Sequence, residues 1–217
     1  LGTRRFMMVN EIYQSIQGES TYAGRPCVFV RTTGCNLRCR WCDTEHAFEA
    51  GDEKPHDCIL DEFRELECPL VEVTGGEPLL QIESFALIRA LLDEGYLVLV
   101  ETSGAIAIDQ VDPRAVIILD VKCPGSGMSA TMRWENLNRL KEKDEVKFVI
   151  ADETDYHWAK AVLREYPSLR EKIIHFSPVF GEMEPRQLAE WILRDRLPVR
   201  LQMQIHKQIW DPTMKGV

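Results

Sequence analysis

The sequence lacks a long apolar run, since no stretch approaches the ~20 consecutive apolar residues that a membrane-spanning helix needs. The segment 1–9 carries two basic residues, but its apolar run is too short for a secretory signal peptide. We therefore expect a cytoplasmic protein with no membrane partner.

Basic charge is also in short supply, and the formal net charge is −9. A nucleic-acid-binding surface needs an excess of lysine and arginine, so we expect no nucleic-acid partner. A small substrate held in a local basic pocket remains compatible with an acidic exterior.

The chain has seven cysteines, neither dense nor even in number, which disfavours a disulfide framework. It also lacks repeats, linkers and low-complexity segments. A length of 217 residues suits one domain with a sizeable core, so we expect a single domain over residues 1–217.

Three of the cysteines, Cys35, Cys39 and Cys42, stand close together with C-x3-C-x2-C spacing. A 4Fe–4S cluster is usually held by four cysteines. Three leave one iron without a protein ligand, and an open coordination position is typical of a site for chemistry.

A zinc site is the alternative reading of these cysteines, with a fourth ligand from His46, Cys58 or Cys68. We interpret the cysteines outside the motif as small apolar residues, since free cysteine is usually buried and inert. They are Cys27, Cys58, Cys68 and Cys123.

Apolar runs and amphipathic stretches alternate along the chain, which predicts an α/β fold. About six parallel strands with helices outside would form an open, partial TIM-like barrel, because a closed eightfold barrel needs about 250 residues. We expect a loop at 45–56, a mobile flap at 125–132 and a helix N-cap at Ser84. The predicted strands are 6–13, 26–31, 70–74, 96–100, 116–122, 145–150, 172–177 and 200–204, and the predicted helices are 59–66, 85–94, 134–143, 152–166 and 185–193.

Candidate functional residues follow the strands, at the ends that carry the chemistry in βα barrels. Arg31 has a planar guanidinium group whose paired donors match a carboxylate. That carboxylate could belong to a ligand or, with equal weight, to an acidic residue in a structural ion pair. Paired glycines in Gly75-Gly76-Glu77-Pro78 allow a close approach to a ligand, and Lys122 offers a point charge for a carboxylate.

The cysteine motif, with an aromatic before its last cysteine, resembles that of radical S-adenosylmethionine enzymes. Within that class, flanking motifs resemble the 7-carboxy-7-deazaguanine synthases, and the likeness spans nearly the whole chain. These motifs are Ser15-Ile16-Gln17-Gly18-Glu19, Phe29-Val30-Arg31, Cys42-Asp43-Thr44, Thr74-Gly75-Gly76-Glu77-Pro78 and His206-Lys207.

The resemblance implies a radical S-adenosylmethionine core and a set of site residues. Cys35, Cys39 and Cys42 would hold the 4Fe–4S cluster, and Thr44 would bind Mg²⁺. S-adenosylmethionine would contact Arg40, Trp41, Gly76, Glu77, Ser103, Lys122 and Ser177. The substrate would contact Ile16, Gln17, Gly18, Arg31, Thr74, His206 and Val217, the last through its carboxylate. Many synthases carry Ser-Pro-Lys where this chain has Asp120-Val121-Lys122, which puts the contacts at positions 120 and 121 in doubt.

The resemblance also implies an activity. The expected substrate is 6-carboxy-5,6,7,8-tetrahydropterin, and the product is 7-carboxy-7-deazaguanine, formed by radical ring contraction with loss of ammonia in deazapurine (queuosine) biosynthesis. The tail 205–217 would close the site, flavodoxin or ferredoxin would supply electrons, and the protein would be a homodimer. The alternatives are another radical enzyme, such as a glycyl-radical activase, and a zinc-stabilised binding module.

Overall fold

The structure is a computed structural model that describes residues 5–217, so residues 1–4 of the segment considered as a signal peptide lie outside the described residues. Within residues 5–217 a single nine-stranded sheet runs in the order β3-β1-β2-β4-β5-β6-β7-β8-β9. The strands are β1 (Phe6–Ile16), β2 (Pro26–Thr32), β3 (Asp52–Pro55), β4 (Leu70–Gly75), β5 (Leu97–Thr102), β6 (Val116–Val121), β7 (Glu145–Ile150), β8 (Ile173–Pro178) and β9 (Arg200–Leu201).

The strands from β2 to β9 in this order pair in parallel, whereas β1 is antiparallel to both β2 and β3. The outermost strands, β3 and β9, do not pair with each other, so the sheet is open. This arrangement confirms the predicted α/β partial barrel. The expected six parallel strands are β2 and β4–β8, and β9 adds a two-residue edge.

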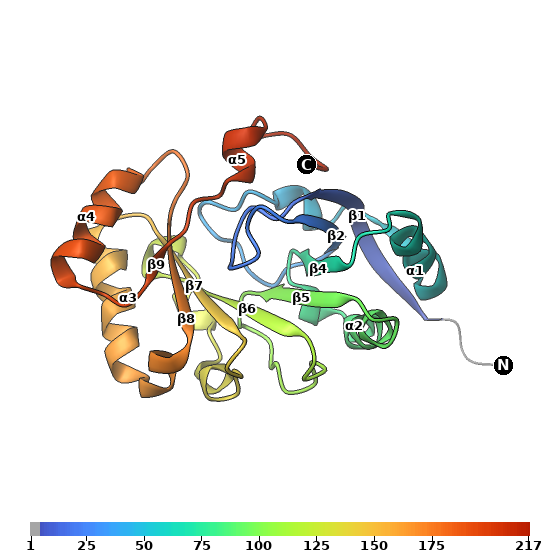
Figure 1. The fold of residues 1–217 in the computed structure, drawn as a ribbon, viewed down its shortest axis with the longest axis horizontal. Helices are drawn as coiled ribbons and strands as arrows, with labels where there is room; N and C mark the ends of the chain where they lie inside the picture. The colour runs from blue at the N-terminus through green and yellow to red at the C-terminus, as the bar shows by residue number, and fades with distance from the viewer. Residues whose placement is uncertain (1–4) are drawn as a thin grey trace.

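The longer helices cover the outside of the curved sheet, with α3 and α4 at the left of Figure 1 and α1 and α2 at the right. In α2 the buried residues Leu87, Ile88 and Leu91 recur at helical spacing and pack into the core. The helices are α1 (His56–Glu65), α2 (Glu83–Asp93), α3 (Glu153–Glu165), α4 (Pro185–Asp195) and the short α5 (His206–Ile209).

Three predicted elements differ from the structure. The expected loop at 45–56 contains β3, a polar edge strand that pairs with β1 although it has no apolar alternation. The helix expected at 134–143 is a 3₁₀ turn, Trp134–Asn138, and the strand expected at 200–204 has only two residues.

The predicted N-cap at Ser84 is wrong. The helix α2 starts at Glu83, two residues before the predicted start at position 85, and the buried Ser84 hydroxyl donates to Pro78 O at 2.6 Å. Asp152, by contrast, caps α3 through an Oδ1 atom that accepts from Asp155 N at 2.9 Å.

The segment 125–132, expected as a mobile flap, folds into 3₁₀ turns. Gly125 N donates to Asp155 Oδ1 at 2.8 Å, and Ser126 O accepts from Arg40 N at 3.0 Å. These bonds tie the segment to α3 and to the cysteine loop. Its mobility stays a prediction.

Within residues 5–217 no helix combines the length and apolar character needed to cross a membrane.

We expect Leu87→Ala to lower the free energy of unfolding by about 2–5 kcal/mol, because truncating this fully buried side chain leaves a cavity in the core. The control is Leu193→Ala, whose side chain is 76% exposed and whose loss should change stability by no more than about 0.5 kcal/mol. Urea titrations followed by circular dichroism compare the two variants. Equal unfolding midpoints would contradict the packing described for α2.

Candidate functional site

A cavity of about 530 Å³ opens where the parallel strands reach their carboxyl ends, and it is lined by most of the predicted site residues. Such strand ends are where βα enzymes bind their substrates. The predicted residues that line it are Ile16, Gln17, Gly18, Arg31, Cys35, Cys39, Trp41, Cys42, Thr44, Thr74, Gly76, Ser103, Lys122, His206 and Val217.

The cysteine loop follows β2 and packs against the loop that follows β4. Glu77 N donates to Gly34 O at 2.8 Å, and Gly34 has a φ of +98°. A methyl group on Gly76 would lie 2.3 Å from Gly34 O and 2.7 Å from Cys35 Cβ. Only glycine at position 76 allows this close approach between the two loops.

The three thiols fit an iron–sulfur cube. Cys35, Cys39 and Cys42 are free, partly exposed and line the same cavity, and soft thiolates suit iron–sulfur clusters. Among residues 5–217, no three His, Cys, Asp or Glu side chains converge on a single ion. The thiolates of a cube bind different irons, so such convergence is not required of them.

Metal-binding thiols must lose their protons. Burial raises the pKa of Cys35 and of Cys39, and the positive charge of Lys122 opposes that rise in both.

The positions of the other cysteines weaken the zinc alternative. Cys58 is exposed on α1, and Cys68 is buried with its Sγ near Pro26 O and Leu70 O, so neither lines the cavity. Of the candidate fourth ligands only His46 does. The prediction of buried cysteines is confirmed for Cys27, Cys68 and Cys123 and is wrong for Cys58.

Glu77 lies behind the cavity wall and does not line it. One of its carboxylate oxygens accepts from Leu79 N and Thr102 Oγ1, and the other accepts from the backbone and hydroxyl of Ser103. Both oxygens of the Glu77 carboxylate therefore already have hydrogen-bond donors from the protein. Glu77 thus holds Ser103, which does line the cavity, and its own contact with S-adenosylmethionine stays a prediction.

Arg40 and Ser177 are the other predicted cofactor contacts that do not line the cavity. The Arg40 guanidinium pairs with Glu182 at 2.7 Å and lies over the Trp41 ring. Ser177 is buried, and its hydroxyl has no hydrogen-bond partner among the described residues. Their contacts with S-adenosylmethionine stay predictions.

Arg31 makes the structural ion pair that was one of its two readings, and it also lines the cavity. Its Nε donates to Glu11 Oε1 at 2.7 Å and its Nη2 to Tyr13 Oη at 2.8 Å. These partners hold the guanidinium in one orientation at the cavity wall.

The Gln17 side chain, expected to contact the substrate, is buried, and its amide makes hydrogen bonds within the protein. Its Oε1 accepts from Glu19 N at 2.9 Å, and its Nε2 donates to Glu72 Oε2. The amide thus fixes the turn that carries Glu19. A direct contact with substrate stays a prediction.

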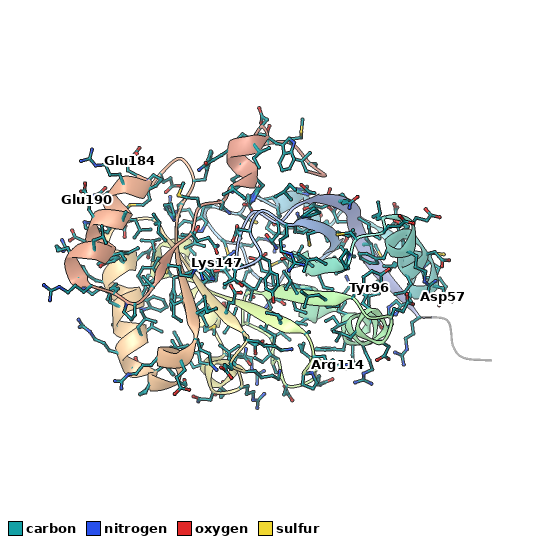
Figure 2. The ribbon with its side chains drawn as sticks, in the orientation of Figure 1. Asp57, Tyr96, Arg114, Lys147, Glu184 and Glu190 are labelled. Carbon is teal, nitrogen blue, oxygen red and sulfur yellow. The ribbon has the colours of Figure 1, made fainter. Side chains whose placement is uncertain are left out.

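Sequence reasoning missed the charged floor of the cavity. Lys147, labelled near the centre of Figure 2, is only 5% exposed in its side chain. It contacts Glu19 at 2.7 Å, Asp120 at 3.4 Å and also Glu101. Lys122 adds a contact of 2.8 Å to Asp120. A signal was present, since Glu72, Glu101, Asp120 and Lys147 each interrupt an apolar strand that the fold buries.

Ion pairing keeps two of these carboxylates charged. Burial alone would raise the pKa of Glu19, but Lys147 outweighs burial and lowers it. The pKa of Asp120 is lowered in the same way by Lys122 and Lys147. Asp120 Oδ1 has no hydrogen-bond partner among the described residues, so one acceptor remains for a ligand.

The C-terminal segment lies over this site, and α5 stands at the top of Figure 1. Ile205 N donates to Gly18 O at 3.1 Å, and a methyl group on Gly18 would lie 1.9 Å from His206 Nδ1. Lys207 Nζ donates to Asp43 Oδ2 at 2.6 Å. These contacts hold the tail beside the cavity, which Val217 helps to line. That the tail closes the site stays a prediction.

Comparison with known proteins identifies the relatives of this chain. It is 48% identical to the 7-carboxy-7-deazaguanine synthase of Chlorobaculum tepidum over the full length of both chains. It is 46% identical to the synthase of Koribacter versatilis, over 97% of this chain and 100% of that one. The chain belongs to the 7-carboxy-7-deazaguanine synthase family. A family model described as the Radical SAM superfamily matches residues 29–116.

Solved structures agree on the fold. The crystal structure of QueE from Escherichia coli superposes with a TM-score of 0.77 at 22% identity, over 91% of this chain and 93% of that one. The structure of TYW1 with a lysine-pyruvate adduct gives a TM-score of 0.57 at 14% identity, over 78% and 73% of the two chains. The superfamily match implies a 4Fe–4S cluster and S-adenosylmethionine as cofactors.

We expect Lys207→Met to loosen the tail, because it removes the charged donor to Asp43. A hydrogen bond of this kind at a partly exposed site is worth about 1–2 kcal/mol, so amide exchange over residues 205–217 should accelerate by roughly 5–30-fold. Hydrogen–deuterium exchange with mass spectrometry measures this.

The matched control is Lys54→Met, which removes an ion pair to Glu62 in the β3–α1 region. It should leave exchange in the tail unchanged. If both variants leave tail exchange at the wild-type rate, the Lys207 contact does not hold the segment.

Proposed function

We propose that this protein converts 6-carboxy-5,6,7,8-tetrahydropterin to 7-carboxy-7-deazaguanine with loss of ammonia. The observation that carries the proposal is the cavity itself. It is lined by three free thiols and by a buried charged floor, in a chain related over its full length to 7-carboxy-7-deazaguanine synthases. When bound, the cluster and S-adenosylmethionine supply the radical chemistry that abstracts a hydrogen atom from the substrate.

On the cofactor side, Cys35, Cys39 and Cys42 would hold the cluster. Lys122 suits the methionine carboxylate as a point charge. The Gly76 backbone and the open acceptor on Asp120 suit the ammonium group, which needs acceptors. This arrangement gives a role to Asp120 in a chain that departs from Ser-Pro-Lys at this position.

On the substrate side, Arg31 would meet the pterin carboxylate, with its orientation set by Glu11 and Tyr13. Burial lowers the pKa of His206, so its imidazole is neutral near pH 7 and has one donor and one acceptor nitrogen. Thr74 and the loop of Ile16 and Gly18 complete the wall, and the tail excludes water.

We propose Thr44 as a ligand of Mg²⁺ that joins the substrate carboxylate. Its hydroxyl lines the cavity beside Cys42, and Mg²⁺ takes hard oxygen ligands together with water and substrate oxygens.

We also propose flavodoxin or ferredoxin as the electron donor, a homodimeric assembly and a cytoplasmic location. All seven cysteines are free, as a reducing compartment requires. The glycyl-radical activase alternative needs a groove for a protein partner, whereas here the C-terminal segment lies across the cavity and suits a small substrate.

Anaerobic incubation with reductant, S-adenosylmethionine and carboxytetrahydropterin tests the proposal, with mass spectrometry of the products. We expect 7-carboxy-7-deazaguanine and ammonia from the wild type and neither from Cys39→Ala. The control Cys58→Ala removes an exposed thiol outside the cavity and should retain activity. Formation of 5′-deoxyadenosine without any deazapurine would keep the enzyme class and reject the substrate. Colourless protein that contains zinc would support the binding module.

The magnesium proposal is tested by Thr44→Val, which keeps the size of the side chain and removes its oxygen. We expect the Mg²⁺ concentration for half-maximal activity to rise by roughly tenfold or more, the scale on which metal sites weaken when their support is lost. The control is Thr154→Val, a change at an exposed position of α3 that lies outside the cavity. Identical Mg²⁺ dependence in the wild type and both variants would remove Thr44 from the metal site.

A further inference from the structure

One carboxyl group in the cavity stands apart from the others. Glu19, Glu101 and Asp120 each contact the Lys147 ammonium. Glu72 lines the same cavity, yet among the described residues it has no ion pair. It is 3% exposed, and its Oε2 accepts a hydrogen bond from the Gln17 amide.

The position of Glu72 in β4 directs it toward the reaction space. It lies two residues before Thr74, so the two side chains project from the same face of the strand, and both line the cavity. The Val71 and Val73 side chains on the other face are fully buried in the core. Glu72 is therefore held inside the cavity by the strand itself.

Its surroundings favour the protonated form of Glu72. Burial, followed by the negative charges of Glu101 and Glu19, raises the pKa of Glu72 well above its usual range, and Lys147 opposes this only in part. The titratable and charged groups that act on it come from β1, the Gln17 turn, β2, β5 and β7. They are Tyr13, Glu19, Cys27, Glu101 and Lys147.

We propose that Glu72 is the general acid that protonates the departing nitrogen during the ring contraction. This inference rests on the proposed function. A neutral carboxyl group beside ionised carboxylates is the arrangement that separates acid from base in other active sites. Glu72 is the group in this cavity whose environment assigns it the acid role.

The step balances without an added oxidant or reductant, because substrate and product differ only by ammonia. The carbon–nitrogen bond breaks, and the nitrogen keeps the electron pair, takes the Glu72 proton and leaves as ammonia. The neighbouring carbon loses a proton, and its bonding pair forms the double bond of the new ring. That proton returns to the Glu72 carboxylate.

The other cavity groups suit this role less well. Ion pairing keeps Glu19 and Asp120 ionised, so they have no proton to give. Burial keeps the His206 imidazole neutral. Once Glu72 has given its proton, the Gln17 amide donor and the nearby Lys147 charge stabilise the carboxylate that remains.

The test is Glu72→Gln in the cluster-loaded enzyme. Glutamine keeps the size of the side chain and an oxygen that accepts from Gln17, but it has no acidic proton. We expect kcat for deazapurine and ammonia formation to fall by about 10²–10⁴-fold, the scale of general acid catalysis, with KM within about threefold of the wild type. The control Glu142→Gln lies on the surface and should match the wild type.

A pH profile separates acid catalysis from a structural role. In the wild type, kcat should fall as pH rises through the pKa of Glu72, because only the protonated form donates. Glu72→Gln should lack this alkaline limb. Glu72→Asp should recover part of kcat and move the limb to lower pH, since aspartic acid is the stronger acid.

The outcomes distinguish the two proposals. A wild-type enzyme that makes no deazapurine overturns the proposed function and this inference with it. A wild type that turns over while Glu72→Gln keeps kcat within about threefold, or keeps the alkaline limb, overturns the role of Glu72 alone. If Glu72→Gln fails to load the cluster, Glu72→Asp decides, and a limb at the wild-type pH overturns the inference.

Discussion

The interaction on which this structure depends is the contact of the Lys147 ammonium with three carboxylates inside the curved sheet. Buried charges are costly unless they are paired. Glu101, Asp120 and Lys147 come from three successive strands, and Glu19 comes from the turn that follows β1. The parallel register aligns the ends of these strands, so a single lysine satisfies carboxylates that are far apart in the sequence.

This network extends to the cysteine loop. Asp120 contacts both Lys147 and Lys122, and the charge of Lys122 opposes the rise in the pKa of Cys39. Lys122 and Asp120 thus link the cysteine loop to the charged floor of the cavity. Glu77 is a second buried carboxylate whose partners come from another strand end. It accepts hydrogen bonds from the backbone and the hydroxyl of Ser103 and so fixes Ser103 at the cavity wall.

The fold was largely predictable because its strands are short apolar runs that a parallel sheet buries on both faces. Those at 116–122 and 145–150 match β6 and β7 closely. β3 was missed because an edge strand of Asp-Glu-Lys-Pro shows no alternation, and only its pairing with β1 makes it a strand. Most residues implied by the family resemblance line the cavity. Glu72 and Lys147 were overlooked, although a charge inside an apolar strand needs a buried partner or a ligand.

The pairing of the floor also explains why Glu72 differs from its neighbours. Lys147 already serves three carboxylates, so a fourth acid in the same low-dielectric space must remain neutral or find another cation. Within residues 5–217 Glu72 makes no salt bridge; its carboxyl group interacts with Glu101 and with the Gln17 amide, and the oxygen of that amide accepts from Glu19 N. The turn that orders the substrate wall and the acid beneath it are thus parts of one hydrogen-bonded chain. A substrate that reorganises this turn would change the environment of the Glu72 proton in the same movement.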